Sequence, residues 1–421
     1  MAKTGFYAGD VLLPQGIDMT KWSVVACDQY TSEPEYWDEV DALVGDSPST
    51  LRVTLPEIYL EQDGVKERIE AVNAAMLSYV ESGILKEFKN SYLYVERTMR
   101  DGTTRPGLMG VVDLEEYDYR KGSQSLIRAT EGTVVERIPP RLRVRENAAL
   151  ELPHIMLLID DEEKTVLEPL AARKTEFDVA YDFTMMMDSG AIKGWFVDAA
   201  AAKVVDSALA ALAEPGAWSA KYNVTDKGVL LFAVGDGNHS LATAKENYEQ
   251  VKRAIGADAA ENHPARYALV EVVNIHDPSL QFEPIHRVLF DVDASDLLSE
   301  LGKTYELAES GEGQKISYVW KQGKGDLVIK NPSANLAVGT LQNFLDKYLA
   351  EKGGRIDYIH GEDVVERLGT QDGNIGFLLP NMEKSELFPT VILDGALPRK
   401  TFSMGHAYDK RFYLEARKIQ K

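Results

Sequence analysis

The spacing of apolar residues changes repeatedly along the chain between the period of a helix and that of a strand. In residues 63–82 the apolar side chains recur every three or four positions, which predicts an amphipathic helix that ends at Gly83. A strand pattern follows at residues 91–97, and turn residues at 101–102 lead into a returning strand at 107–113. Alternation of this kind is typical of a mixed α/β protein.

The same periods predict the other elements of the chain. We expect strands at residues 155–160, 229–234, 268–275, 316–320, 326–330 and 375–379, and helices at residues 199–213, 240–254, 341–352 and 362–368. The expected fold class is therefore α/β with mixed sheets. Residues 214–227 contain Pro and Gly without a clear period, so we expect two closely packed α/β lobes that divide there, at residues 1–220 and 221–421.

Residues 229–254 predict a strand, a glycine loop and a helix, beginning VLLFAVGDGNHSLATAK. Glycine lets the backbone approach a ligand, and a helix N-terminus offers N–H groups and the positive end of the helix dipole. The loop at 235–240 therefore predicts a phosphate-binding site, with Asp236 as a metal ligand or proton acceptor. The other residues expected there are His239 as a catalytic group and Gly235, Gly237, Asn238 and Ser240 as binding groups. The alternative is a connecting turn, in which Asn238 or Ser240 caps the helix and His239 packs inside.

A second polar cluster follows the predicted strand at 268–275. His276 and Asp277 come directly after this strand, and ligands of α/β proteins bind at the carboxyl ends of strands. In the sequence FEPIHR that comes next, His286 could carry a proton and Arg287 could hold a phosphate with two hydrogen bonds. A surface loop with a capped turn explains the same residues equally well.

Charge is distributed unevenly along the chain. Lys and Arg total 46 against 67 Asp and Glu, and the net charge of −21 argues against binding to nucleic acid, whose phosphates would be repelled. Residues 120–145 and 398–421 are nevertheless basic, with a net charge of +5 each. These two islands could form an anion site if the fold brings them together, or they could pair with the acidic majority.

Other features narrow the class of protein. The single cysteine, Cys27, excludes an intrachain disulfide and a zinc ribbon, in keeping with a reducing compartment. No apolar run is long enough to span a membrane, so we expect a cytoplasmic protein. The glycine motifs of Walker A loops and dinucleotide-binding folds are incomplete, and no pair of histidines has metal-ligand spacing.

Five segments in order along the chain resemble the bacterial and archaeal domain-of-unknown-function 1015 family. Residues 229–245 are similar to its signature, which usually reads ADGHHRYETA. The remaining matches are VVACDQY at 24–30 for an early PYD segment, RATEGT at 128–133 for HExT with the arginines Arg137 and Arg141 after it, EPIHR at 283–287 for P-x-HR, and LPRKT at 397–401 for MPxKST. The resemblance runs along the whole chain.

This resemblance has implications for the loop. The DGHHR core of the family is similar to a loop of the ParB/sulfiredoxin-like fold, which includes nucleotide-dependent enzymes and a free-serine kinase, and in which the loop holds nucleotide phosphates. It implies that residues 237–240 line a phosphate site with Asp236 near the metal. The chain departs from the family pattern at Asn238 in place of His, Ser240 in place of Arg and Ala242 in place of Glu. Loss of the arginine weakens phosphate binding by about 1–3 kcal/mol unless Arg287, Arg399 or Lys400 supplies the charge.

Three hypotheses follow, ranked in this order. The first is a nucleotide-dependent phosphotransferase that acts on a small polar metabolite and uses Mg²⁺ with ATP, ADP or CTP. Its general base would be Glu131 or Asp236, and His286 would be a further acid/base group. The groups that stabilise charge during the transfer would be Arg137, Arg287 and Lys400. The second is a non-catalytic module that binds or senses an anionic metabolite or nucleotide. The third is a metal-dependent hydrolase built from Asp236, His239, His276 and His286. The oligomeric state is open.

Overall fold

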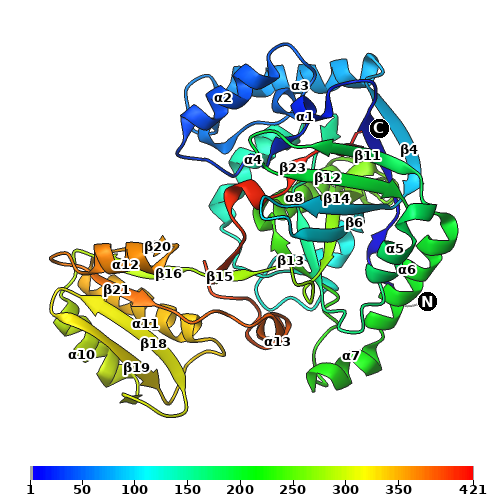
Figure 1. Cartoon of the computed structure of the whole chain (residues 1–421). Helices are drawn as coiled ribbons and strands as arrows, with labels where there is room; N and C mark the ends of the chain where they lie inside the picture. Colours follow the sequence, from blue (N-terminus) through cyan, green and yellow to red (C-terminus); the bar gives the residue numbers. More distant parts are fainter. Residues whose placement is uncertain (1–2, 421) are drawn as a thin grey trace. The chain divides into compact units, whose positions relative to one another are not determined.

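The structure, a computed structural model, describes residues 3–420 and divides the chain into two compact units (Figure 1). Unit 1 runs to Leu280 and resumes at His406, and unit 2 is Gln281–Gly405. The expected boundary at residue 220 does not separate them, because strands from both sides of it pair in one sheet. The segment that resembled a linker contains helix α7 (Pro215–Tyr222), whose Trp218 is buried and donates a hydrogen bond to the Leu230 carbonyl.

Unit 1 is built on a ten-stranded mixed sheet. Strands β5 and β6 form the predicted hairpin, and β10 pairs parallel to β14 but antiparallel to β13. In the order in which they lie side by side, the strands are β11 (Val179–Thr184), β12 (Ala191–Phe196), β5 (Leu93–Thr98), β6 (Thr104–Asp113), β14 (Tyr267–Asn274), β10 (Met156–Ile159), β13 (Phe232–Asp236), β8 (Ile127–Ala129) and β7 (Tyr117–Asp118), and β1 (Phe6–Tyr7) pairs with β6.

Apolar side chains cover both faces of this sheet. On one face Val234 of β13 packs in a cluster with Leu241 of α8 and Val205 of α6. On the other face Met109 of β6 packs in a cluster with Trp37 of α2. The helices of unit 1 are α1 (Met19–Trp22), α2 (Pro34–Val44), α3 (Val65–Glu81), α4 (Ile138–Arg145), α5 (Glu168–Arg173), α6 (Ala199–Leu212), α7, α8 (Asn238–Ile255) and α9 (Ala257–Ala260).

Short ladders attach the C-terminal residues to the start of the chain. Strand β23 (Phe412–Tyr413) pairs with β3 (Val24–Val25), and β24 (Arg417–Lys418) pairs with β9 (Leu150–Glu151). A further ladder joins β2 (Gly9–Pro14) to β4 (Leu85–Ser91). Residues far apart in the sequence therefore meet on the α2 face of the sheet.

Unit 2 has a six-stranded sheet of its own. Its strands lie in the order β17 (Leu307–Ala308), β19 (Gly323–Ile329), β18 (Gln314–Trp320), β21 (Ile375–Leu378), β16 (His286–Phe290) and β20 (Arg355–Ile359), while β15 (Phe282–Pro284) pairs with β22 (Phe402–Met404). The helices are α10 (Ala294–Thr304), α11 (Ala337–Lys352), α12 (Glu362–Gly369) and α13 (Lys384–Asp394).

The structure confirms the α/β fold class and finds an element at each predicted position. The helix expected at 63–82 is α3, and the strand expected at 229–234 is β13, which begins three residues later at Phe232. Within the described residues, no helix combines the length and the apolar character that crossing a membrane requires.

Candidate functional site

The predicted strand, loop and helix form a continuous unit at residues 232–255. Strand β13 ends at Asp236, and Gly237 is the N-cap of the 18-residue helix α8. Gly237 has φ +79°, and a Cβ atom there would lie 3.0 Å from Ile155 Cα. Only glycine fits this backbone without strain. Because the N-cap residue has no side chain, it offers no oxygen to the N–H groups of the first turn of α8.

A β-bulge turns the Asp236 side chain away from the helices. Met156 pairs with Asp236 but Leu157 pairs with Val234, so Gly235 is an extra residue in β13. Val234 packs with α8, whereas Asp236 lies in register with Met156 and Glu271 on the opposite face. There its Oδ2 is 3.2 Å from Lys410 Nζ, and its Oδ1 accepts the Gly237 N–H at 2.8 Å.

Strand β8 brings a second segment to the loop. It runs parallel to β13, so the two carboxyl ends lie together. The Asn238 Oδ1 accepts a hydrogen bond from the Thr130 N–H at 3.3 Å, and the Thr130 hydroxyl donates to the Val234 carbonyl at 2.6 Å. Glu131, the next residue, is half-buried and adjacent to the loop.

The first turn of α8 also contacts a buried polar chain. Ser240 Oγ is 3.2 Å from Nε2 of His154, and the Asp28 carboxylate is 3.5 Å from the same nitrogen. The Tyr413 hydroxyl lies 3.1 Å from His154 Nδ1 and 2.8 Å from Cys27 Sγ. Since Ser240 and Asp28 share one ring nitrogen, these residues are not a Ser-His-Asp triad, which needs them on opposite nitrogens.

Charge and burial set the protonation of this chain. Burial opposes charge on both members of the His154–Asp28 pair, but their mutual attraction is stronger, so the pKa of His154 is raised and that of Asp28 is lowered. Burial raises the pKa of the Cys27 thiol far above its usual range, and Cys27 therefore remains protonated.

A cavity of about 150 Å³ adjoins these residues. Its polar lining includes Ser240, Thr243 and His154, and its charged lining includes the ion pair between Arg141 and Glu57. The remaining wall is largely apolar, with Val53, Leu55, Leu60, Met76, Val144, Leu150, Leu152 and Ile155. A largely apolar pocket with a few polar groups is typical of a small-molecule site.

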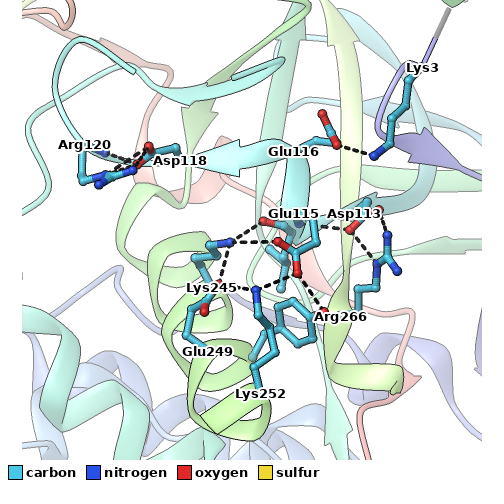
Figure 2. A network of polar contacts seen from close by, with 12 residues as sticks. Lys3, Asp113, Glu115, Glu116, Asp118, Arg120, Lys245, Glu249, Lys252 and Arg266 are labelled. Carbon is cyan, nitrogen blue, oxygen red and sulfur yellow. Dashed lines mark hydrogen bonds and ion pairs between the residues drawn. The ribbon is translucent and has the colours of Figure 1, made fainter. Parts of the chain in front are cut away.

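A polar network fixes the position of α8 in the unit. Figure 2 shows Lys252 of α8 bonded to Glu115 at 2.7 Å and Lys245 bonded to Glu249 at 2.9 Å. The Lys245 ammonium also donates to the Leu114 carbonyl at 2.9 Å. The contacts of Lys245 with Leu114 and of Lys252 with Glu115 hold the helix against the segment that follows β6.

The predicted site residues of unit 2 have other partners. His286 is buried, its Nδ1 accepts the Leu379 N–H at 3.1 Å, and burial lowers its pKa. The fully buried Arg287 guanidinium donates to the carbonyls of Ile285, Arg399 and Lys400 and to the Gln342 side chain. The EPIHR and LPRKT segments thus meet in unit 2, and Arg287 binds backbone there.

The two basic residues of LPRKT differ in their contacts. Arg399 is exposed and donates to the Tyr358 hydroxyl and to Asp346, both at 2.5 Å. Lys400 is exposed and has φ +54°. In unit 1, Arg137 is exposed and its carbonyl accepts a hydrogen bond from Arg141 of α4, the helix that packs against α8.

The residues proposed for a hydrolase do not assemble as metal ligands. His276 Nε2 is 2.6 Å from Asp160, a carboxylate that also accepts from Tyr222. Across residues 3–420, no three His, Cys, Asp or Glu side chains are grouped closely enough to bind a metal ion. A preformed multi-ligand metal centre is therefore not part of the described structure.

The two basic islands meet around a carboxylate. Glu151 is buried and forms ion pairs with Arg145 of the first island and Arg417 of the second. Lys410 likewise pairs with Asp236, and Arg411 pairs with Glu271 and Glu415. The two basic islands therefore pair chiefly with acidic side chains of the protein itself, as the alternative to an anion site predicted.

Sequence reasoning missed the residues that reach the loop from distant segments. Lys410 and His154 carry no motif, and they meet the loop only through the pairing of β10, β13 and β23. Thr130 lies inside the RATEGT segment that resembles the family, so the family motif could have indicated that this residue reaches the loop.

The chain matches one family of proteins of unknown function. A model of the family "Protein of unknown function (DUF1015)" matches residues 13–348. No curated protein matches the chain.

Three solved structures are distantly similar. A free serine kinase in complex with AMP is 10% identical, with 74% of this chain and 90% of that chain covered and a TM-score of 0.37. A conserved hypothetical protein from Pyrococcus furiosus is 11% identical, with coverages of 73% and 94% and a TM-score of 0.36. SbnI with a C-terminal truncation from Staphylococcus aureus is 11% identical, with coverages of 70% and 83% and a TM-score of 0.35.

Proposed function

This chain belongs to the DUF1015 family, and from the site around its glycine loop we propose that it is a nucleotide-dependent phosphotransferase for a small polar metabolite. The observation that carries the proposal is the glycine N-cap of α8. Gly237 is held in a left-handed conformation against Ile155, and the long helix after it directs its N–H groups and dipole toward the end of β13. The resemblance of the loop to ParB/sulfiredoxin-like phosphate loops supports the same interpretation.

The residues near the loop supply the groups that phosphoryl transfer needs. An acceptor hydroxyl oxygen bonds to the γ-phosphorus, the bond from that phosphorus to the bridging oxygen breaks, and a nucleoside diphosphate leaves. The hydroxyl proton passes to Glu131 or Asp236, and Lys410 and the first turn of α8 stabilise the charge that develops on the phosphate oxygens. The cavity beside Ser240 has room for part of a small ligand.

Asp236 is compatible with a magnesium ion that arrives with the nucleotide. Mg²⁺ in such sites is usually bound by one or two carboxylates together with phosphate oxygens and water, so a single carboxylate suffices. Such an ion would supply positive charge that offsets the charge of the phosphate. Asp236 contacts Lys410 in the structure, and metal binding would take the place of that contact.

The test is a thermal-shift titration of the full chain with ATP, ADP, CTP and inorganic phosphate, each with and without Mg²⁺. A nucleotide at a hundred times its Kd raises the melting temperature of a unit of this size by about 4 °C. We expect a Mg²⁺-dependent shift that Asp236→Asn removes. Glu249→Gln, on the same helix about three turns from the loop, is the matched control and keeps the shift.

If the nucleotide shifts the melting temperatures of Asp236→Asn and Gly237→Ala as much as that of the wild type, the support for a phosphate site at this loop is removed. Where the shift behaves as expected, turnover is measured as nucleoside diphosphate released in the presence of pooled hydroxy metabolites. Glu131→Gln then identifies the proton acceptor: a retained nucleotide shift without release assigns that role to Glu131, whereas retained release assigns it to Asp236.

A second function, binding or sensing without turnover, is favoured by the two departures from the family pattern. Asn238 bonds to Thr130, and Ser240 contacts His154, so both side chains are engaged within the protein. Recovery of the bound nucleotide unchanged after long incubation with Mg²⁺ and the acceptor pool would select this alternative.

A further inference from the structure

Two buried arginines face each other on the α2 face of the main sheet in unit 1. Arg97 of β5 and Arg105 of β6 are directly opposite in the antiparallel register. Arg97 is 2% exposed and Arg105 is 4% exposed. Like charges at directly opposed positions repel each other, and burying them costs additional free energy. An arrangement of this kind therefore needs a compensating anion.

Among the described residues, no carboxylate bonds directly to Arg105. Within residues 3–420, the Arg105 side chain makes no ion pair or hydrogen bond, and its Nε is a buried donor without an acceptor. Arg97 donates only to the backbone carbonyls of Thr98, Ser189 and Tyr408, and its own Nε also has no acceptor among the described residues. Burial lowers the pKa of both groups. The charge of Arg105 lowers the pKa of Arg97 further, and the charge of Arg411 lowers that of Arg105.

The nearby carboxylates already have other partners. Glu271 lies on the same face of the sheet, where its carboxylate covers Gly107, two residues from Arg105. Its Oε2 is bonded to Arg411, which also binds Glu415. The second oxygen of Glu271 has no partner within the described residues, so it does not bond to Arg105 either.

We propose that the side chains of Arg97 and Arg105 form a binding site for the anionic group, a carboxylate or a phosphate, of a small-molecule ligand. The Arg105 guanidinium, whose donors have no acceptor among the described residues, offers the planar, multiple donors that such groups bind best, and Arg97 adds its charge and its Nε. The bulge at Gly235 turns Asp236 to the same face, and Asp236 acts electrostatically on Arg105. A ligand anchored on the arginines therefore lies on the side of the sheet that carries Asp236. The inference does not depend on phosphotransfer.

The principal test uses the full chain and two simple anions, inorganic phosphate and succinate, in a chloride buffer. We expect at least one of them to raise the melting temperature of the wild-type protein and to have no effect on Arg105→Met. Arg105→Lys keeps the positive charge but loses the planar set of N–H donors, so it should bind the anion at least about tenfold more weakly than the wild type. The anion that acts identifies the group recognised.

Stability without added anion provides a second readout. Arg105→Met should melt at or above the wild-type temperature, because it removes a buried charge that has no partner. Arg411→Met is the matched control and should melt lower, because it leaves Glu271 and Glu415 unpaired. If Arg105→Met also melts below the wild type and keeps the anion response, the proposal is wrong. A water molecule that bridges Arg105 and Glu271 would then account for the buried charge of Arg105.

Failure of this site is distinguishable from failure of the glycine loop. Gly237→Ala should retain the Arg105-dependent anion response, since the loop is a separate binding surface. A wild-type protein that responds to neither anion, or an anion response that persists in both Arg105 variants, overturns the proposal whatever the nucleotide titration shows.

Discussion

The glycine loop of unit 1 and the EPIHR–LPRKT cluster of unit 2 contain similar residue types but use them differently. In the loop, Asp236 and the first turn of α8 lie next to a cavity and to a lysine from a distant segment. In the cluster, Arg287 is fully buried and its N–H groups bind backbone carbonyls. A His-Arg pair in a sequence is therefore equally compatible with a catalytic role and with a structural one until its partners are known.

The largest expected effect tests the scaffolding side of this comparison. Arg287→Met leaves the buried carbonyls of Ile285 and residues 399–400 without donors, so we expect a loss of at least about 3 kcal/mol in the stability of unit 2. Hydrogen exchange measures this separately in each unit. Loss of nucleotide binding with unchanged protection of residues 281–405 would instead make Arg287 a ligand-binding residue.

The second effect tests the loop. Gly237→Ala should cost about 2–3 kcal/mol, because the left-handed backbone and the contact with Ile155 both oppose a Cβ. Gly64 is the matched control, because it is the N-cap of α3 and has φ +81°. A Cβ atom there would meet only Oε2 of Glu67, at 3.9 Å. Gly64→Ala should cost about 1–2 kcal/mol and leave nucleotide binding intact. Chemical denaturation and the nucleotide titration measure the two responses, and equal costs at both glycines would contradict the close packing at Ile155.

The third effect is pH-dependent and has opposite signs in the two units. The pKa of His154 is raised by Asp28, so its contribution to stability is fully present below the unfolded value of about 6.5 and is lost as pH rises through the folded value. The pKa of His286 is lowered by burial, so unit 2 loses stability as pH falls through about 6.5 toward the folded value.

Unfolding from pH 5 to 9 of the wild type, His154→Gln and His286→Gln measures these signs. The stability difference between the wild type and His154→Gln should shrink as pH rises, and that between the wild type and His286→Gln should shrink as pH falls. The pKa of Asp28 is lowered, so Asp28 stays ionised and keeps its contribution to stability above about pH 3.8. The His154–Asp28 ion pair is therefore not lost through protonation of Asp28 between pH 5 and 9. Parallel slopes for the two variants would show that the histidines have similar environments.

The smallest effect concerns the exposed arginine of the cluster. Arg399→Ala removes a surface pair with Asp346 and should change stability by less than about 1 kcal/mol. Nucleotide affinity should also stay constant, because the loop residues lie in unit 1. A tenfold loss of affinity in Arg399→Ala would show that unit 2 contributes to the nucleotide site and would remove the contrast between the two regions.

Local pattern predicted the elements well because it depends on local physics. The apolar run before Gly235 predicted β13, and the glycines predicted the turn into α8. The same reasoning placed the domain boundary at 220, because α7 begins at Pro215 and its apolar face is short. Only the pairing of β13 with β8 and β10 shows that this segment is inside unit 1.

Prediction of the site was less complete for a related reason. Asp236 and Glu131 were expected near the loop, and their strands do end side by side. Arg97, Arg105 and Lys410 were not expected to act, because nothing in the sequence marks a charged residue whose partners are missing or lie far along the chain. Such residues are recognised only when every neighbouring donor and acceptor is known.

The sequence by itself determined the strand–glycine–helix unit, the α/β class and the membership of residues 13–348 in a family, since each depends on residues close together in the chain or on their order. The tertiary structure decided which polar groups are free to act. Sheet order and the return of the C-terminal segment place Lys410 on Asp236 and bring Arg105 opposite Arg97, where the Arg105 side chain has no bonded partner within residues 3–420. In unit 2, the fold assigns Arg287 to backbone carbonyls. The reason is that hydrogen bonds and ion pairs act over a few ångströms in space, whatever the distance along the chain.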